Sequence, residues 1–219
     1  MTSGTGRAGR AGEERAGAQQ WVPPDADVES LRAAAPGCRG CELWAGATQV
    51  VFSTGDERAR VMLVGEQPGD REDREGLPFV GPAGKVLDEA LEAAGIDRGR
   101  VYTTNAIKHF RFVERGKRRI HKTPGVAHIE ACLPWLEAEL AAVAPGVVVC
   151  LGATAGRAVL GREVKVTAER GRHLSRPGPD GDLRVVLTTH PSAVVRLRGR
   201  PEFDAAFEAL VTDLRAAVV

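Results

Sequence analysis

The sequence lacks long apolar runs. Its continuous apolar stretches, such as 147–151, are far shorter than the roughly 20 residues that a membrane-spanning helix requires. The first twenty residues are rich in Gly, Ala, Arg and Glu and have no apolar core, which excludes a typical signal peptide. We therefore expect a cytoplasmic protein that does not bind membranes, with a flexible N-terminal tail at 1–27 and one domain at 28–219.

The sequence also lacks a large net charge, which is only +1, so any sign of a polyanionic partner must come from where the charges lie. Segment 108–122 holds seven Lys or Arg and one acid, whereas segment 66–75 holds five acids and two arginines. A basic arm beside an acidic pocket is typical of an enzyme that binds a phosphodiester chain and stabilises a cationic transition state. Two ordinary solvated surfaces would look the same.

Cysteine is scarce. Cys38 and Cys41 form a CxxC, and Cys132 and Cys150 follow far downstream. In a cytoplasmic protein an even number of cysteines favours metal or redox chemistry over structural disulfides. A Pro-Gly turn precedes the CxxC where a thioredoxin-like site would have a strand. The spacing fits a cubane iron–sulfur cluster and a zinc site about equally well, and Cys132 and Cys150 also fit simple buried positions.

Hydrophobic periodicity predicts strands and helices in alternation. Continuous apolar runs next to glycine indicate buried strands, and apolar residues at helical spacing indicate helices. We expect strands at 60–65, 101–105, 146–151 and 184–189, and helices at 82–94, 123–143, 153–160 and 201–218. Pro134 should kink the second of these helices. The alternation predicts an α/β fold, a three-layer α/β/α domain around a central, mainly parallel four-stranded sheet.

Four residues directly follow the expected strands: Glu66, Asn105, Gly152 and His190. In open parallel sheets, ligands bind just beyond the carboxyl ends of the strands. We therefore expect these four residues at one edge of the sheet, where they form a candidate site.

A further histidine, His121, lies inside the basic run 117–124. Neighbouring positive charges should lower the pKa of its imidazole and leave a neutral ring nitrogen available as a nucleophile or base. The same cations would hold a phosphate backbone against it. The alternative is an incidental histidine in a solvated basic loop.

Four segments carry a family resemblance when taken together: 65–70 (GEQPGD), 77–84 (LPFVGPAG), Thr104-Asn105 and 190–192 (HPS). With the cysteine pattern, they resemble the iron–sulfur uracil-DNA glycosylases of family 4 over nearly the whole chain after about residue 30. The insertion 117–124 is similar more narrowly to the UdgX group of that superfamily. Members of that group become covalently bound to the DNA they attack.

The resemblance implies a role for each residue of the pocket. Such an enzyme extrudes the base and reads its edge, so Phe79 would stack on uracil and Asn105 would pair with its Watson–Crick edge. Glu66 would lie near the cationic sugar, while His190 and backbone amides near Gln67 would face the uracil oxygen. From the sequence alone, Phe79 also fits a core aromatic residue and Asn105 also fits a turn cap.

The resemblance assigns the remaining residues as follows. Gly65 lines the pocket, Gln67, Asp70 and Asp73 order it, and Arg119 and Lys108 steady the basic loop or the phosphates. Asp73 fits a helix cap or a solvated acid equally well. A 4Fe-4S cluster would be held by Cys38, Cys41, Cys132 and Cys150.

The role of His121 decides whether the reaction ends in a covalent adduct or in hydrolysis. The resemblance implies that its imidazole attacks the anomeric carbon and stays attached, with Glu66 orienting or deprotonating it. The expected partner is uracil-containing DNA, preferably single-stranded, and the expected state is a monomer. Gly125 replaces an expected serine, and loop 110–116 is shorter than expected. The alternatives are a hydrolytic family 4 enzyme that turns over and a non-catalytic binder of single-stranded or uracil-containing DNA.

Overall fold

The computed structural model describes residues 16–178 and 181–218. Its main sheet has six strands in the order β1-β3-β2-β6-β8-β7. These strands are β1 (Ser53–Gly55), β2 (Val61–Gly65), β3 (Val101–Asn105), β6 (Val147–Leu151), β7 (His173–Gly178) and β8 (Gly181–Thr188). The inner four are parallel, whereas β1 and β7 run antiparallel at the edges. The predicted parallel sheet is confirmed. The two edge strands, β1 and β7, were not predicted, because neither is a continuous apolar run.

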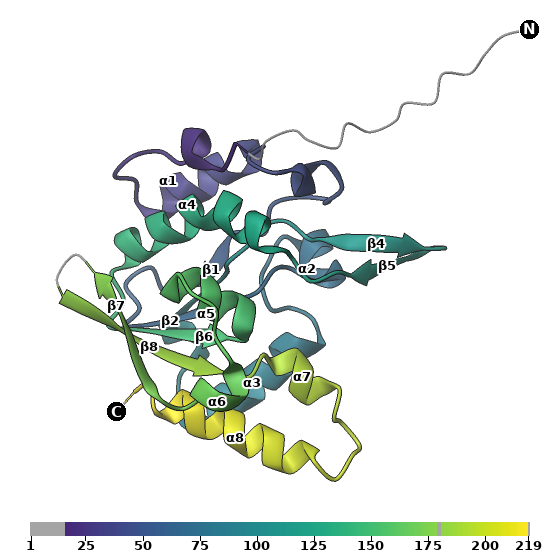
Figure 1. Ribbon diagram of the computed structural model, residues 1–219, viewed down its shortest axis with the longest axis vertical. Helices are drawn as coiled ribbons and strands as arrows, with labels where there is room; N and C mark the ends of the chain where they lie inside the picture. Colours follow the sequence, from purple (N-terminus) through teal and green to yellow (C-terminus); the bar gives the residue numbers. More distant parts are fainter. Residues whose placement is uncertain (1–15, 179–180, 219) are drawn as a thin grey trace, which may run out of the picture.

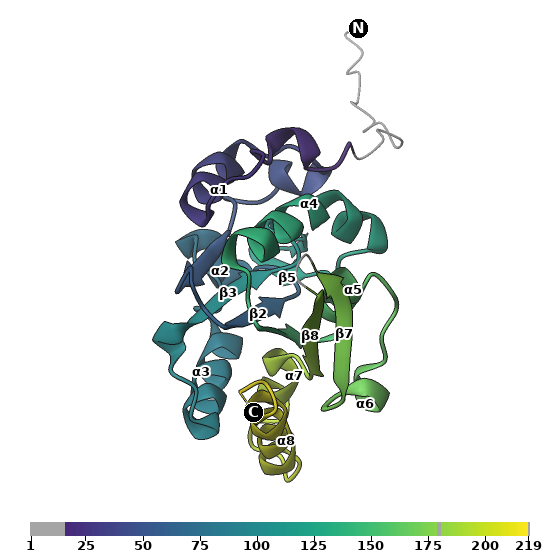
Figure 2. The same ribbon diagram turned by 90° about the vertical axis from the view of Figure 1, so that its left-hand side faces the viewer.

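The helices cover both faces of this sheet (Figures 1 and 2). They are α1 (Val28–Ala34), α2 (Asp70–Glu75), α3 (Pro82–Ala94), α4 (Val126–Val143), α5 (Ala153–Leu160), α6 (Val166–Glu169), α7 (Pro191–Val195) and α8 (Phe203–Arg215), with short 3-10 turns at Gln19–Trp21, Ala35–Gly37, Glu42–Ala45 and Arg98–Arg100. Helix α4 continues through Pro134. None of the described helices is long and apolar enough to cross a membrane.

Two hydrophobic cores lie on opposite faces of the sheet. Successive side chains of β2 point to opposite faces, so Met62 packs in one core with Trp135 of α4. Leu63 packs in the other core with Leu91 of α3 and Leu214 of α8. Burial on both faces explains why the central strands are continuously apolar and do not alternate.

The packed structure begins before residue 28. Ala18 is fully buried, and its N–H donates to the carbonyl of Ala131 in α4 at 2.8 Å. The N–H of Gly17 donates to the carbonyl of Gly40 at 3.1 Å. The expected flexible tail at 1–27 therefore does not extend over residues 16–27. One small buried side chain and two backbone hydrogen bonds hold this segment. The segment contains no apolar run from which this packing could be predicted. Residues 1–15 lie outside the described residues.

The basic segment forms a hairpin instead of the expected loop. Strands β4 (Phe112–Arg115) and β5 (Arg118–His121) pair antiparallel and form a separate two-stranded sheet. Gly116, with φ of 58°, adopts the left-handed conformation that a two-residue turn requires. The hairpin projects from the body of the protein beside α2 (Figure 1).

Lys108 lies inside the protein and does not reach the phosphates of a bound DNA, so this expectation is wrong. Its side chain is only 1% exposed, and its ammonium group pairs with the carboxylate of Glu139. The same group donates to Thr104 Oγ1 at 2.6 Å and to the carbonyl of Asn105 at 2.9 Å. Tyr102 donates to the other oxygen of Glu139 at 2.8 Å. A buried lysine requires such partners, and the basic composition of the segment gives no sign of them.

Changing Lys108 to Met should destabilise the fold by about 3–5 kcal/mol, because the change leaves the Glu139 carboxylate buried without its countercharge. The free energy of unfolding from urea titration measures this loss. The double change Lys108→Met/Glu139→Leu removes both charges and should recover most of the stability. A single variant as stable as the wild type would contradict the structural role of the pair.

Candidate active site

Gly65, Phe79 and Asn105 pack together where β2 and β3 end, and we call this cluster the slot. Gly65 lies opposite Asn105 in the parallel register. A Cβ atom at Gly65 would lie 2.2 Å from Asn105 Oδ1 and 2.6 Å from Phe79 Cζ. Phe79 has a φ of 57°, which is uncommon for a bulky residue and marks a backbone held by its surroundings. An aromatic ring and an amide thus converge over a position where only glycine fits.

Glu72 holds together the two loops that build this slot. Its Oε1 accepts the N–H of Gly81 at 2.8 Å, and its Oε2 accepts the N–H of Gly69 at 3.1 Å. In the sequence, Glu72 stands out only as one of five acids in segment 66–75. Its position as the third residue of α2 could have indicated this role, because an acid there often accepts the backbone N–H that precedes the helix.

His190 is held as a neutral donor. Its Nδ1 accepts the N–H of Ser192 at 3.1 Å and lies 2.9 Å from Ser192 Oγ, so the proton of the neutral ring is on Nε2. Burial, together with the nearby His121 and Arg196, lowers the pKa of His190 to about 4. The ring of His190 stacks near that of Phe79, with 6.1 Å between centroids. His190 can therefore donate from Nε2 without carrying charge.

Glu66 and His121 meet at the mouth of the slot. His121 Nε2 lies 3.4 Å from Glu66 Oε1, and the His121 side chain is 47% exposed. Thr154, at the start of α5, donates to Glu66 Oε2 at 2.5 Å. One carboxylate oxygen is thus held by the fold while the other faces the imidazole. The sequence analysis missed Thr154, although it lies two residues beyond Gly152 at the end of β6.

Arg119 anchors the hairpin to helix α2. Its guanidinium lies 2.5 Å from Asp70 Oδ1 and 2.6 Å from Asp73 Oδ2, and it also lies over the rings of Phe110 and Phe112. Hydrogen bonds to the two acids raise the pKa of Arg119 against the opposing effect of its burial. Arg119 is only 14% exposed, so its charge serves the hairpin and not a phosphate. Asp70 and Asp73 are its anchors.

Gln67 fixes the base of the same hairpin. Its Oε1 accepts the N–H of Arg111 at 3.0 Å, and its Nε2 donates to the carbonyls of Arg111 and Lys122 at 3.2 Å each. The side chain of Gln67 is therefore engaged with both strands of the hairpin. It orders the pocket by positioning the segment that carries His121.

Three of the four cysteines gather beside α4. The Cys132 sulfur accepts the Lys108 N–H at 3.4 Å, and the Cys38 sulfur accepts the indole N–H of Trp135 at 3.3 Å. Burial raises the pKa of the Cys132 thiol to about 12, and Cys41 and Cys38 contribute to that rise. These contributions indicate that the three thiols are neighbours.

The fourth cysteine, Cys150, is fully buried in the middle of β6 and belongs to the same hydrophobic core as Cys38 and Cys132, against which Cys41 also packs. Burial raises the pKa of the Cys150 thiol. Near these residues in the chain, His109 follows Lys108, and burial together with the charge of Arg39 lowers the pKa of His109 to about 4.

Within residues 16–178 and 181–218, no group of three His, Cys, Asp or Glu side chains is arranged around a single metal ion. In a cubane cluster each protein ligand binds a different iron atom, so its ligands do not converge on one point. The four thiols of the expected set contribute to one core and form a donor set of the right chemistry.

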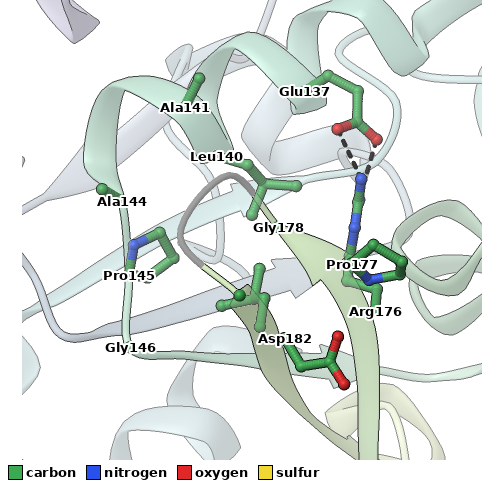
Figure 3. Close-up of a pocket in the computed structure, with 12 residues that line it drawn as sticks. Glu137, Leu140, Ala141, Ala144, Pro145, Gly146, Arg176, Pro177, Gly178 and Asp182 are labelled. Atoms are coloured by element: carbon green, nitrogen blue, oxygen red, sulfur yellow. Dashed lines mark hydrogen bonds and ion pairs between the residues drawn. The ribbon is translucent and has the colours of Figure 1, made fainter.

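A separate cavity of about 280 Å³ lies between the end of α4 and the β7-β8 pair (Figure 3). Arg176 and Glu137 form a two-pronged ion pair at its rim, at 2.9 and 2.8 Å. The cavity lies where β6 and β8 begin, opposite the edge that carries Glu66 and His190. It is therefore not part of the candidate active site.

The fold and site define an α/β protein with a candidate site beyond the carboxyl ends of its parallel strands. The family follows from sequence comparison. A model of the uracil DNA glycosylase superfamily matches residues 52–215, which include every strand of the structure. The chain belongs to this superfamily.

Several curated relatives are named Type-4 uracil-DNA glycosylase. The protein from Thermotoga maritima is 37% identical over 162 residues, which cover 74% of this chain and 79% of that protein. The protein from Pyrobaculum aerophilum is 32% identical over 187 residues, covering 82% and 92%. The protein from Archaeoglobus fulgidus is 32% identical over 176 residues, covering 78% and 85%.

Acidification should weaken the fold through His190. Its pKa is about 4 in the folded protein and roughly 6.5 in an unfolded chain, so between these values the unfolded state binds the proton better. The contribution of His190 is fully present above about pH 6.5 and is lost as the pH falls toward 4. The free energy of unfolding, measured from pH 7.5 to 4, should fall less steeply for His190→Gln than for the wild type. Equal slopes would contradict the prediction.

Proposed function

We propose that this protein is a uracil-DNA glycosylase that excises uracil from DNA, preferably single-stranded DNA, and that His121 then becomes covalently bound to the abasic sugar. The observation that carries the proposal is the 3.4 Å approach of His121 Nε2 to Glu66 Oε1 at the mouth of the slot. Membership of the superfamily and the names of the relatives support the glycosylase activity. The covalent step rests on the geometry of His121 and on the resemblance of its segment to the UdgX group.

The slot accounts for recognition of the base. An extruded uracil stacks on Phe79, and Asn105 donates to and accepts from its edge, which distinguishes uracil from cytosine by the reversed donor and acceptor pattern. Gly65 lets the Asn105 amide and the Phe79 ring approach the end of β2, because a side chain at this position would collide with both. A buried amide left unpaired by the wrong base is the source of this selectivity.

The charges of the site match bond cleavage. The bond between sugar and base breaks with its electron pair going to uracil, which leaves a cationic sugar and an anionic base. The Glu66 carboxylate stabilises the sugar, and the Nε2–H of His190 donates to the uracil oxygen. A donor aimed at such a developing anion contributes about 3 kcal/mol in comparable sites.

Capture of the sugar follows from the position of His121. In the tautomer with its proton on Nδ1, the Nε2 lone pair forms a bond with the cationic anomeric carbon, and the imidazolium so formed loses its Nδ1 proton to water, which leaves a neutral alkylated imidazole. The Glu66 carboxylate orients the ring and stabilises the positive charge during this step. The protein is consumed after one reaction. The other oxygen of Glu66 stays bound to Thr154, which keeps the carboxylate directed at the imidazole.

A second candidate is an ordinary hydrolytic glycosylase. The relatives carry the name of the Type-4 enzymes, and the half-exposed His121 leaves room for water at the sugar. In that reaction water takes the place of His121 as nucleophile, and the enzyme turns over.

We further propose that Cys38, Cys41, Cys132 and Cys150 hold a 4Fe-4S cluster. The cluster would brace the N-terminal segment against α4 and β6, because Cys38 and Cys41 belong to the first, Cys132 to α4 and Cys150 to β6. We also propose a monomeric, cytoplasmic protein that acts on uracil-containing DNA.

Changing His121 to Ser should abolish the covalent product while uracil is still released, because only the nucleophile is removed. The wild type and the variant are incubated with a labelled single-stranded oligonucleotide containing uracil and run on a denaturing gel, with free uracil measured in parallel. A thymine oligonucleotide is the control. An adduct that persists in His121→Ser would refute capture by this histidine, and repeated turnover by the wild type would favour hydrolysis.

The ligand assignment predicts the iron content of variants. Cys132→Ala and Cys150→Ala should lose bound iron and its visible absorption, because each change removes a thiolate ligand, whereas His109→Ala should keep both. Iron is measured on protein purified without air. Full retention of iron in Cys150→Ala would contradict the assignment.

A further inference from the structure

The β4-β5 hairpin has two faces that differ in their surroundings. In the antiparallel register Val113 lies opposite Ile120, and Arg115 lies opposite Arg118. Because side chains alternate along a strand, these four residues share one face, which we call the outer face. The other face carries Arg119 and packs on α2 through the two aspartates described above.

The outer face exposes an apolar pair. Val113 is 45% exposed and Ile120 is 40% exposed, although both are aliphatic residues in a strand. A two-stranded sheet has no second layer of its own to cover such a pair. Adjacent exposed aliphatic side chains on a projecting element indicate a contact surface more than scattered surface residues do.

The charges beside this pair indicate the kind of partner. Arg115 and Arg118 are exposed and directly opposite each other, a pairing of like charges that destabilises a hairpin. Among the described residues no carboxylate forms an ion pair with either arginine, and Lys117 in the turn adds a third cation. The hairpin's one acid, Glu114, lies on the inner face opposite Arg119. A polyanion relieves this repulsion.

We propose that the outer face, Val113, Arg115, Arg118 and Ile120, docks the nucleotides that flank the uracil in a single-stranded DNA. The arginines bind phosphates and the aliphatic pair packs against a sugar or an exposed base face. An unstacked single strand offers such apolar faces, whereas a duplex hides them between its base pairs. The inference rests on the proposed function, since the same hairpin brings His121 to the sugar.

Two double variants separate the two kinds of contact. Arg115→Gln/Arg118→Gln removes the cations and Val113→Ser/Ile120→Ser removes the apolar pair. The matched control, Arg58→Gln/Arg100→Gln, removes two exposed arginines that precede β2 and β3 at the opposite edge of the sheet. Binding of a labelled single-stranded oligonucleotide without uracil is measured by fluorescence anisotropy over a range of salt concentrations.

The arginine variant should reduce the slope of log affinity against log salt by about 1.4, since each phosphate contact to a single strand contributes about 0.7. The serine variant should bind about tenfold more weakly with an unchanged slope. The control should match the wild type. The proposal is overturned if both outer-face variants bind as the wild type does, or if the control loses as much affinity as they do.

Uracil release in a single turnover adds an independent test. On a long oligonucleotide both outer-face variants should be slower than the wild type, whereas on a short one limited to uracil and its nearest neighbours they should match it. Equal losses on both substrates would mean that the variants disturb His121 or the fold, and would overturn the docking role. If the wild type releases no uracil from either substrate, the proposed function fails, and the binding measurements still decide the docking surface.

Discussion

The ion pairs of Arg119 with Asp70 and Asp73 are the interaction on which the site depends. A two-stranded hairpin is marginal by itself, so His121 reaches Glu66 only if the hairpin is held to the body. Exposed ion pairs contribute little to stability, but Arg119 is mostly buried, contacts two carboxylates and lies over two aromatic rings. The acidic segment and the basic hairpin are therefore joined by these ion pairs, so the charges of Arg119, Asp70 and Asp73 are not available to bind DNA.

The two histidines of the site differ because their surroundings differ. His190 is partly buried, its Nδ1 is occupied by Ser192, and its lowered pKa keeps it neutral with a donor on Nε2. His121 is half exposed at the end of a projecting strand, with a carboxylate 3.4 Å away. One ring is suited to stabilise an anion, and the other is accessible to an electrophile. The fold thus separates two functions of one residue type by burial and hydrogen bonding.

The assignment of Lys108 shows where reasoning from sequence fails. Lys108 and Arg119 belong to the same basic segment, yet Lys108 ends in the core against Glu139, which follows 31 residues later. The partner of Lys108 lies on another element, and no local pattern specifies it.

The sequence by itself determined the parallel core of the sheet, its covering helices and the edge at which Glu66, Asn105 and His190 gather, because apolar periodicity is local and strand ends in a parallel sheet share one side. Only the tertiary structure decided which charges are buried, which loops Glu72 joins, and that a basic loop is a hairpin anchored by Arg119. Those features depend on pairing between residues far apart in the chain, and the free energy of such pairing is set by burial, which exists only after the elements have packed.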